Sequence, residues 1–317
     1  MKKHNILSAG MAFCDIPLRP CPANIMELDN WNIEPVEYHT GGDALTVAVV
    51  LAKMGEDVTL SSEVGNDSAG QFIKKELDRC GVKTDLIRTV KEYSTATSYQ
   101  LIEEDGQRHF LVDKRIHLLP KSSDVRDEDL KGRDLLFYGS ALAINSMDDV
   151  QISDLFRRAH AQNVPTAMDA SVAVPDSAEC KMDLLRETLK ETDIFIPSYE
   201  EASYLAQKTD VYEIIDAFRQ FPFRVFGIKL GSEGCIVTED FNDFIKVPPC
   251  HVEKVVDTTG AGDCFMGGFL CAYLKGWTLR ECAVFGSAVA AFGISDIGAT
   301  TAVPDFDTVY SFMKRSL

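Results

Sequence analysis

The residues of this sequence with the clearest chemical potential lie at positions 255–269, in the run VVDTTGAGDCFMGGF. Gly260 and Gly262 allow a sharp backbone turn and a close approach to a bound group. The segment that follows predicts a helix, whose first amides have no intrahelical partner and therefore attract anions such as phosphate. A carboxylate at a phosphate site repels the anion unless it has another task. We interpret Asp263 as a general base that accepts the proton of a hydroxyl attacking the γ-phosphorus of a nucleotide.

The same turn has a plainer interpretation, as an ordinary strand-to-helix connection in which the aspartate caps the helix. Two better-known phosphate-binding patterns do not occur in the chain. It contains no GxxxxGK[ST], and a GxGxxG pattern starting at Gly260 would need a glycine where Phe265 stands. The failed GxGxxG pattern also disfavours a nicotinamide-dependent dehydrogenase.

A second glycine turn opens the run TGGDALTVAVVLAKMG. Gly41 and Gly42 precede a long apolar helical segment, which is expected to be buried on most of its surface. Asp43 is placed to cap this helix, and Gly55 is placed to end it. The start of the helix is a second place where bare backbone could approach a ligand. A plain capped core helix is the alternative.

Hydrophobic patterning predicts strands that alternate with helices over most of the chain. Strands are predicted at 6–13, 58–64, 135–138, 165–168, 194–196, 223–230, 235–238 and 244–247, with a further short one at 255–256. Helices are predicted at 67–80, 148–162, 180–191, 263–275 and 279–294, from PSYEEA onward and after Pro304. Repeated strand–helix units predict a mostly parallel sheet covered by helices on both faces.

Two segments interrupt this alternation. The stretch 17–38 holds four prolines and little periodicity, while 97–102 and 108–112 predict a hairpin with Asp105 and Gly106 at its tip. We therefore expect one domain over residues 1–317 with a small β lid formed by about 14–40 and 95–118. Such lids exclude water from a reacting centre.

Several acidic residues follow predicted strands. Asp15 follows the first strand, Asp169 follows the strand at 165–168, and the turn 257–263 follows the run at 255–256. Ligands of open α/β sheets bind outside the carboxyl ends of the strands. We therefore expect these residues to face one crevice.

The composition excludes some partners. The formal charge is −17 and no block of lysine or arginine occurs, which argues against nucleic acid and against an anionic membrane. The nine cysteines are scattered without CxxC, which favours a reducing compartment; Cys264, Cys271 and Cys282 are expected in the core. The short apolar N-terminal stretch favours a buried strand over a signal peptide, and no apolar run has the length of a membrane span. We expect a cytoplasmic protein.

The two glycine-containing runs, in this order and separation, resemble the N-terminal and C-terminal signatures of the ribokinase/PfkB family of carbohydrate kinases. The resemblance extends over nearly the whole chain and is strongest in DTTGAGDCFMGGF. It implies a ribokinase-like three-layer α/β/α sandwich with a small β lid. It also implies ATP-dependent phosphorylation of a hydroxyl of a small sugar or sugar-like polyol, with Mg2+ as cofactor.

The resemblance also implies individual roles. Asp263 is then the catalytic base. The anion hole for the transferring phosphoryl group is formed by Gly260, Ala261 and Gly262. Substrate hydroxyls are held in a pocket that includes Asp15, Gly41, Gly42, Asp43 and Thr46. The nucleotide is held by the turn in IKLGSEG, with Lys229, Gly231 and Gly234, and the adenine lies near Gly298. Glu201 then acts on Mg2+ through water. Asp257 and Thr259 match positions that contribute to a K+ site in some members.

Three positions depart from the family pattern. Thr46 and Ser171 stand where asparagine is common, and Ser198 replaces the asparagine of the NxxE motif that ends in Glu201. None of them touches Asp263 or its anion hole. We therefore expect the chemistry to be kept and the preference among acceptors to be unusual.

Two alternatives stay open. A nucleoside kinase of the same fold would need an aromatic shelf for the base, which Phe13, Tyr99 or Phe110 could supply. A non-catalytic sugar or nucleotide sensor is the second alternative, and the intact Asp263 argues against it. The exposed edges of a lid hairpin need covering, so we also expect a homodimer formed through the lid.

Overall fold

The computed structural model describes residues 3–104, 107–112, 121–143, 147–171 and 181–316. The described strands of its large sheet are β1 (Asn5–Ala9), β4 (Asp57–Gly65), β5 (Lys83–Val90), β8 (Leu135–Ala141), β9 (Thr166–Ala170), β10 (Ile194–Phe195), β11 (Val225–Lys229), β12 (Cys235–Thr238) and β13 (Ile245–Val247). Their order is β13-β12-β11-β10-β9-β8-β1-β4-β5. Only the pairs of β12 with β11 and β13 are antiparallel among these strands, so the predicted mostly parallel sheet is confirmed.

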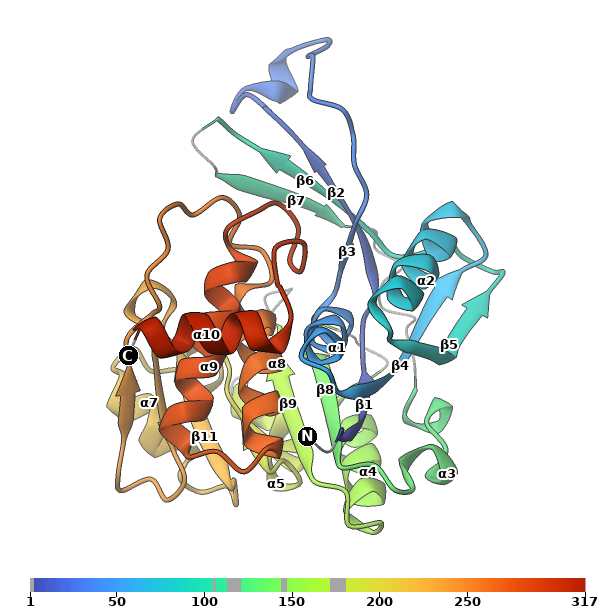
Figure 1. Cartoon of the computed structure of the whole chain (residues 1–317). Coiled ribbons are helices and arrows are strands. Elements are labelled where there is room, and N and C mark those ends of the chain that lie inside the picture. The colour runs from blue at the N-terminus through green and yellow to red at the C-terminus, as the bar shows by residue number, and fades with distance from the viewer. Residues whose placement is uncertain (1–2, 105–106, 113–120, 144–146, 172–180, 317) are drawn as a thin grey trace.

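Helices cover both faces of this sheet (Figure 1). One face carries α1 (Asp43–Lys53), α2 (Ser68–Cys80), α8 (Ala261–Leu274), α9 (Leu279–Gly293) and α10 (Phe306–Ser316). The other carries α3 (Asp127–Leu130), α4 (Asp149–His160), α5 (Arg186–Lys190), α6 (Tyr199–Ala206) and α7 (Val211–Phe218). Short 3-10 helices lie at Ile25–Glu27, Ser122–Asp124, Lys181–Leu185 and Gly231–Glu233.

Each face has its own apolar core. Successive side chains of a strand point to opposite faces, so Ile6 packs with the first set of helices and Leu7 with the second. In β8, Phe137 and Tyr138 divide between the two cores in the same way. The three-layer α/β/α sandwich expected from the sequence is thereby confirmed.

A second, smaller sheet lies above the large one (Figure 1). Its described strands are β2 (Phe13–Leu18), β3 (His39–Gly41), β6 (Thr97–Ile102) and β7 (Arg108–Val112), in the order β3-β2-β6-β7. β6 and β7 pair antiparallel with the predicted bounds, so the hairpin is confirmed. The predicted tip at 105–106 and the stretch 113–118 lie outside the described residues.

The prediction of one strand over 6–13 is wrong. β1 ends at Ala9, and Gly10 follows with a φ of 142°, a conformation that side chains disfavour. A Cβ at Gly10 would lie 2.5 Å from the carbonyl oxygen of Gly139. The chain therefore leaves the large sheet here, and Asp15 lies inside β2 of the small sheet rather than at the end of a central strand.

Other local predictions also need correction. Asp43 does not cap α1, because the N-cap is Gly42, with a φ of 95°, and no side chain caps this helix end. Residues 255–256 form no strand; Val255 and Val256 are exposed, and the amide of Val256 donates to the carbonyl of Ile294. Of the predicted helix 180–191, position 180 lies outside the described residues and the rest divides into a 3-10 turn and α5.

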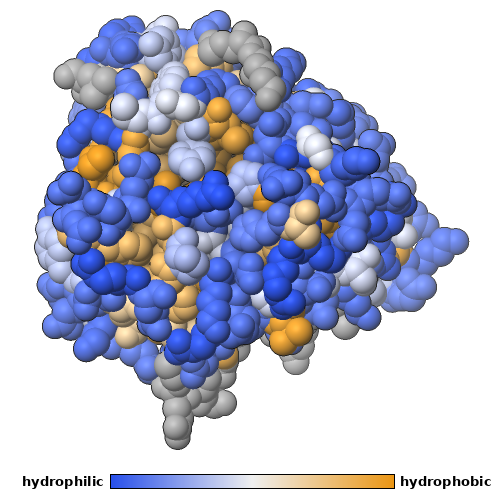
Figure 2. Space-filling view, turned by 90° about the horizontal axis from the view of Figure 1, so that it is seen from below, coloured by the Kyte–Doolittle hydropathy of each residue, from blue (hydrophilic) through white to orange (hydrophobic). Residues whose placement is uncertain are grey.

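The surface and the buried cysteines agree with the composition. The face of the molecule turned away from the small sheet is mainly hydrophilic (Figure 2). Cys264, Cys271 and Cys282 are fully buried, as expected, and the cysteines within the described ranges are free thiols. Among the helices that the structure describes, none is long and apolar enough to cross a bilayer.

Candidate active site

The first turn of α8 forms one wall of a cavity of about 840 Å³. Gly260 is the N-cap of this helix, with a φ of 71°, and a Cβ there would lie 2.3 Å from the Cβ of Ala299. Only glycine fits this position without displacing Ala299. Gly260, Ala261, Gly262 and Asp263 all line the cavity, so the predicted turn does face an open space at a helix N-terminus.

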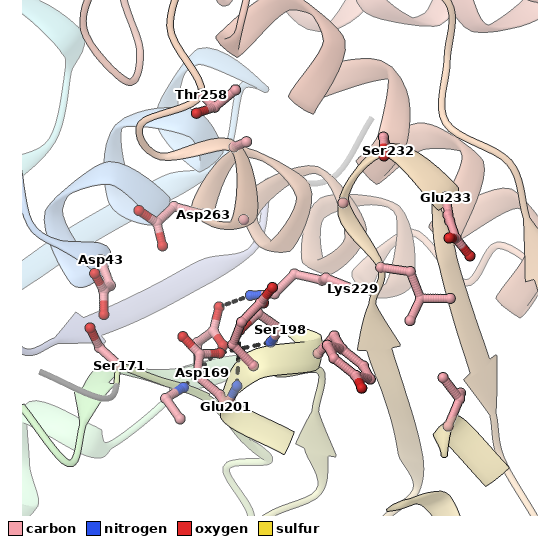
Figure 3. A pocket seen from close by; sticks show the side chains of 18 of the residues that line it. Asp43, Asp169, Ser171, Ser198, Glu201, Lys229, Ser232, Glu233, Thr258 and Asp263 are labelled. Carbon is pink, nitrogen blue, oxygen red and sulfur yellow. Dashed lines mark hydrogen bonds and ion pairs between the residues drawn. The ribbon is translucent and has the colours of Figure 1, made fainter. Parts of the chain in front are cut away.

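Side chains from other elements close the rest of this cavity (Figure 3). Asp43 comes from the start of α1, Asp169 from the end of β9 and Lys229 from the end of β11. Ser198 and Glu201 come from the start of α6. The carboxyl ends of parallel strands thus bring together residues that are far apart in the sequence.

Lys229 and Asp169 form a buried ion pair in this cavity. The Lys229 ammonium donates a hydrogen bond to Asp169 Oδ2, and the two side chains are 12% and 3% exposed. A Cβ added at Gly262 would lie 3.2 Å from Lys229 Nζ, so the ammonium lies against the first turn of α8. The pair therefore places one positive charge directly beside the anion site.

Negative charge is in excess around that lysine. Burial, with the carboxylates of Asp43 and Asp169, raises the pKa of Asp263 well above its usual range, and Lys229 opposes this shift only in part. Burial, followed by the charge of Glu201, raises the pKa of Asp43 to about 6. Burial likewise raises the pKa of Asp169 to about 7. An anion site flanked by so many carboxylates suits a ligand that arrives with cations or with hydrogen-bond donors.

Glu201 and Ser198 form a capping box at the start of α6. The Ser198 amide donates to Glu201 Oε2 at 2.7 Å, and the Glu201 amide donates to Ser198 Oγ at 3.3 Å. Serine therefore serves as N-cap where the family pattern has asparagine, and Glu201 is held at the cavity wall.

The carboxylates fit a magnesium ion held mainly by water and phosphate. Among the residues that the structure describes, no three His, Cys, Asp or Glu side chains converge closely enough to hold a metal ion by themselves. Mg2+ usually keeps several waters and takes one or two carboxylates together with substrate phosphates. Glu201, held by its capping box in the wall of the cavity beside the first turn of α8, matches that pattern.

Asp15 joins the same acidic region from the small sheet, although it is not among the residues that line the cavity. Its carboxylate packs against Gly41, where a Cβ would lie 2.1 Å from Asp15 Oδ2. Burial, followed by the charges of Asp257 and Asp43, raises the pKa of Asp15 to about 7. The structure thus brings Asp43 and Asp257 within electrostatic range of Asp15.

Two residues at the start of α1 carry buried polar atoms that lack a hydrogen-bond partner in the described structure. Within the described residues, Asp43 Oδ2 and Thr46 Oγ1 are buried and have no hydrogen-bond partner. Buried polar atoms in native proteins are almost always paired with protein, water or ligand. The methyl group of Thr46 lies 3.5 Å from the position of a Cβ at Gly260, so the expectation that Thr46 stays clear of the anion hole is wrong.

Three further residues of this region were not found from the sequence. His39 Nε2, Tyr138 Oη and Ser140 Oγ are also buried without a hydrogen-bond partner in the part of the chain that the structure describes, although His39 Nε2 lies 3.8 Å from Glu37 Oε2. Ser140 has a φ of 72°, a strained conformation for serine. Tyr138 and Ser140 lie in a strand that reads as core, and His39 is identified only by its register opposite Asp15.

Asp257 and Thr259, predicted to serve a cation, and Gly298, predicted to lie near the adenine, are joined by hydrogen bonds. Asp257 Oδ1 accepts the Thr259 amide at 2.7 Å, and Asp257 Oδ2 accepts the Gly298 amide at 3.1 Å. Gly298 has a φ of 86° and packs against His39, whose Nδ1 would lie 2.4 Å from a Cβ there. Gly298 therefore joins the loop after α9 to the small sheet.

A second cavity, of about 550 Å³, continues from the first on its far side. The two share Lys229, Gly231, Ser232, Thr258, Ala261 and Gly262, and Gly234 lines the second one. The apolar wall of the second cavity comes from Val252, Val255, Phe265, Ala290 and Ile294. A polar space next to a helix N-terminus and an apolar one beyond it match the phosphates and the base of a nucleotide. The sequence predicted apolar helices that contain Phe265, Ala290 and Ile294 but gave no sign that these residues line a cavity together with Val252 and Val255.

Comparison with known proteins adds the context for this site. The model of a family described as pfkB family carbohydrate kinase matches residues 13–305. A protein of Archaeoglobus fulgidus described as an uncharacterized sugar kinase is 29% identical over 254 residues, which are 80% of this chain and 98% of that protein. An ATP-dependent ribose-1-phosphate kinase of Halopiger xanaduensis is 26% identical over 311 residues, 98% of each chain.

Among solved structures, that of Arabidopsis thaliana ribokinase complexed with ribose and ATP is similar over 99% of both chains. Its TM-score is 0.81 and its sequence identity is 23%. The likeness concerns the fold, and the same three layers and small sheet are the ones described above.

Proposed function

This chain belongs to the pfkB family of carbohydrate kinases, and from that premise we propose that it transfers the γ-phosphoryl group of ATP to a hydroxyl of a small sugar or sugar-like polyol, with Asp263 as general base. One observation carries the proposal. Asp263 lies in the first turn of α8 and lines the same cavity as Asp43, whose Oδ2 atom is buried without a hydrogen-bond partner among the described residues. A base at that position is within reach of both the acceptor and the phosphoryl group.

The nucleotide occupies the two connected cavities. Its phosphates lie over the first turn of α8, where the amides of Gly260, Ala261 and Gly262 and the Lys229 ammonium face the transferring group. Gly231 and Gly234 let the turn after β11 approach the nucleotide, and the apolar wall that includes Phe265 encloses the base. Gly298 acts through its contact with Asp257 and closes the loop beside this wall.

The acceptor lies between the small sheet and α1. Asp15 and Asp43 accept hydrogen bonds from its hydroxyls, and Thr46 contributes a hydroxyl of its own. Gly41 and Gly42 leave room for the acceptor beside the backbone. Carboxylates that share one small space repel each other, and a ligand rich in hydroxyl donors relieves that repulsion.

In the transfer, the acceptor oxygen forms a bond to the γ-phosphorus as the bond from phosphorus to the leaving ADP oxygen breaks. The proton of the acceptor hydroxyl passes to the Asp263 carboxylate. The raised pKa of Asp263 makes it a stronger base than an exposed aspartate. When bound, Mg2+ neutralises the charge of the β- and γ-phosphates, and Glu201 would hold it through water. A K+ site at Asp257 and Thr259 stays a prediction.

The small sheet is proposed to act as the lid, since it carries Asp15 over the cavity. Among the strands that the structure describes, β7 lies at the edge of this sheet; Phe110, Leu111 and Val112 of β7 are exposed, and so is Tyr99 of β6. An apolar, unpaired edge favours association with another chain. A homodimer through this sheet is the arrangement we propose for solution.

The test is a coupled assay of ADP release with Mg-ATP over pentoses, hexoses, polyols, sugar acids, sugar phosphates and nucleosides. We expect one neutral sugar or polyol to exceed the others by at least about tenfold in kcat/KM. A nucleoside as the best acceptor would replace the sugar assignment. Nucleotide binding without ADP release for any acceptor would identify a sensor and contradict the proposal.

A further inference from the structure

We propose that Asp169 is a positioning residue for the phosphoryl transfer, because its buried carboxylate holds the Lys229 ammonium beside the first turn of α8. This role rests on the proposed function of the cavity. It goes beyond the glycine signatures, which assign nothing to Asp169, and it concerns a residue 60 positions before Lys229 in the chain.

Both members of the pair are rigidly placed. Asp169 lies in β9 at the carboxyl end of the sheet and is 3% exposed. Its Oδ1 accepts the amide of Ala170 at 3.0 Å, which leaves Oδ2 directed to the ammonium. The backbone of Lys229 is held by its amide, which donates to the carbonyl of Pro197 at 2.9 Å. The long lysine side chain is thus fixed at both ends.

Lys229 has competing partners in the same cavity. Burial alone would lower its pKa, but Asp169 and then Glu201 and Asp263 favour the charged form and raise it. The elements packed around the ammonium contribute Asp169 from β9, Asp43 from α1, Glu201 from α6 and Asp263 from α8. Without Asp169, the carboxylates left around the ammonium in the described part of the chain include the base Asp263. Pairing with Asp263 would withdraw the base from the acceptor hydroxyl.

Asp169 therefore has two effects on the reaction. It keeps the ammonium beside Gly262, where charge develops on the transferring phosphoryl group, and it keeps the ammonium away from Asp263. Preorganised charge of this kind acts mainly on the transition state and little on ground-state binding. Its loss should therefore appear in kcat rather than in nucleotide affinity.

The chain contains a matched control. Glu56 and Lys275 form a second buried carboxylate–lysine pair, with side chains 1% and 9% exposed. This pair lies at the other end of α8, after Leu274, and takes no part in the cavity. Glu56→Gln makes the same chemical change as Asp169→Asn outside the site.

The primary experiment compares Asp169→Asn with Glu56→Gln. We expect Asp169→Asn to lower kcat by about 10- to 100-fold, the range typical of residues that orient a catalytic group. The dissociation constant of Mg-ATP, measured by calorimetry, should stay within about threefold of the wild-type value, and Glu56→Gln should keep the wild-type kcat. Wild-type turnover in Asp169→Asn, or a loss of kcat matched by an equal loss of nucleotide affinity, would overturn the proposal.

A double-mutant cycle tests whether Asp169 acts through Lys229. In a Lys229→Met background, Asp169→Asn should change kcat by less than about twofold, because the group that Asp169 positions is gone. An undiminished effect in that background would show that Asp169 acts independently and would overturn the proposal. Asp169→Asn alone could fail to fold because it leaves the Lys229 ammonium buried without a counter-charge. In that case, the comparison of Lys229→Met with the double variant still tests the proposal.

A measurement without any acceptor separates this inference from the proposed function. Tetrafluoroaluminate with Mg-ADP imitates the transferring phosphoryl group. It should tighten Mg-ADP binding in the wild-type protein and do so at least about tenfold less in Asp169→Asn. That loss would support the role of Asp169 even if no acceptor in the panel were phosphorylated. An equal gain in both proteins would refute that role while leaving the kinase activity untouched.

Discussion

The two buried carboxylate–lysine pairs lie at opposite ends of α8 and serve different purposes. Glu56 is fully satisfied: it accepts hydrogen bonds from the Lys275 ammonium and, at 2.7 Å, from the His4 amide, and it also contacts His4 Nδ1. Burial alone would raise the pKa of Glu56, but these hydrogen bonds offset it and hold the pKa below its usual range. This end of the molecule is electrostatically balanced.

At the other end, the pair of Asp169 and Lys229 is surrounded by surplus negative charge. Asp43, Glu201 and Asp263 face the same ammonium, and the pKa of Asp169 is raised to about 7, chiefly by burial. A buried charge arrangement that is unfavourable in the ligand-free protein persists where function requires it. The two pairs have similar geometry and burial, so the geometry of an ion pair does not by itself identify a functional site. The excess of negative charge around the pair of Asp169 and Lys229 is what distinguishes it.

The largest expected effect is at the charged end. Asp263→Asn should lower kcat by about 100- to 10,000-fold, the usual contribution of a general base, while keeping the affinity for Mg-ATP. Because the change removes one of several mutually repelling buried carboxylates, we also expect the melting temperature to rise by a few degrees. Calorimetry and the ADP-release assay measure both effects. An unchanged turnover number would remove Asp263 from the mechanism.

The second effect belongs to the balanced end. Glu56→Gln leaves the Lys275 ammonium buried without its counter-charge, so we expect the free energy of unfolding to fall by about 3 kcal/mol. Turnover at a temperature well below the transition should stay at the wild-type level. Urea denaturation followed by circular dichroism measures the change. A stability equal to that of the wild type would mean that the two ends of α8 do not differ in the way described.

The smallest expected effect is that the stability of the fold depends on pH in opposite senses at the two ends of α8. The raised pKa values of Asp15 and Asp43 mean that their protonated forms stabilise the fold at low pH and that this stability is lost as pH rises through about 6 to 7. The melting temperature of the ligand-free protein should therefore fall by several degrees between about pH 5.5 and pH 8. Glu56 acts in the opposite sense, since its lowered pKa contributes stability that is lost on acidification below its usual value.

A control separates the pH dependence caused by Asp15 and Asp43 from that caused by other titrating groups. The pKa of His160 is raised by its hydrogen bond to Asp193, so its contribution is also lost as pH rises. The difference between the wild type and Asp15→Asn isolates the site, and that variant should show a flatter curve. Parallel curves for the two proteins would contradict the raised pKa of Asp15.

The sequence predicted the layers of the fold well because the hydrophobic periodicity of each helix and strand reflects which of its faces is buried. It missed β5, whose outer position leaves only Ile87 and Val90 buried, so that the strand carries little hydrophobic signal. It wrongly assigned a strand at Val255 and Val256, since β-branched residues favour strands only where a neighbouring strand is present to pair with them. The break at Gly10 depends on the nearby Gly139, which local patterns cannot report.

For the site, the contiguous patterns were found and the long-range ones were not. The glycine turns and Asp263 lie in short contiguous runs, so the residue types and their spacing are enough to predict a phosphate-binding turn with a nearby base. The pair of Asp169 and Lys229 joins two strands through the fold, and the unsatisfied atoms of Tyr138 and Ser140 emerge from a strand that looks like core. The assignment of roles to individual residues stays a prediction until the variants are measured.

The connections between the two sheets hold the small sheet in its place above the large one. Two described crossings contain glycines of positive φ, Gly10 at 142° and Gly42 at 95°. A third is clamped, because Asp67 accepts the amide and the hydroxyl of Thr95 just before β6. A Cβ at Gly10 would lie 2.5 Å from the carbonyl oxygen of Gly139, and one at Gly42 would lie 2.6 Å from that of Met11, so both glycine crossings are close-packed turns that a larger residue would disturb. The position of Asp15 relative to Asp43 therefore depends on two close-packed glycine turns and on the contact of Asp67 with Thr95, none of which lines the cavity.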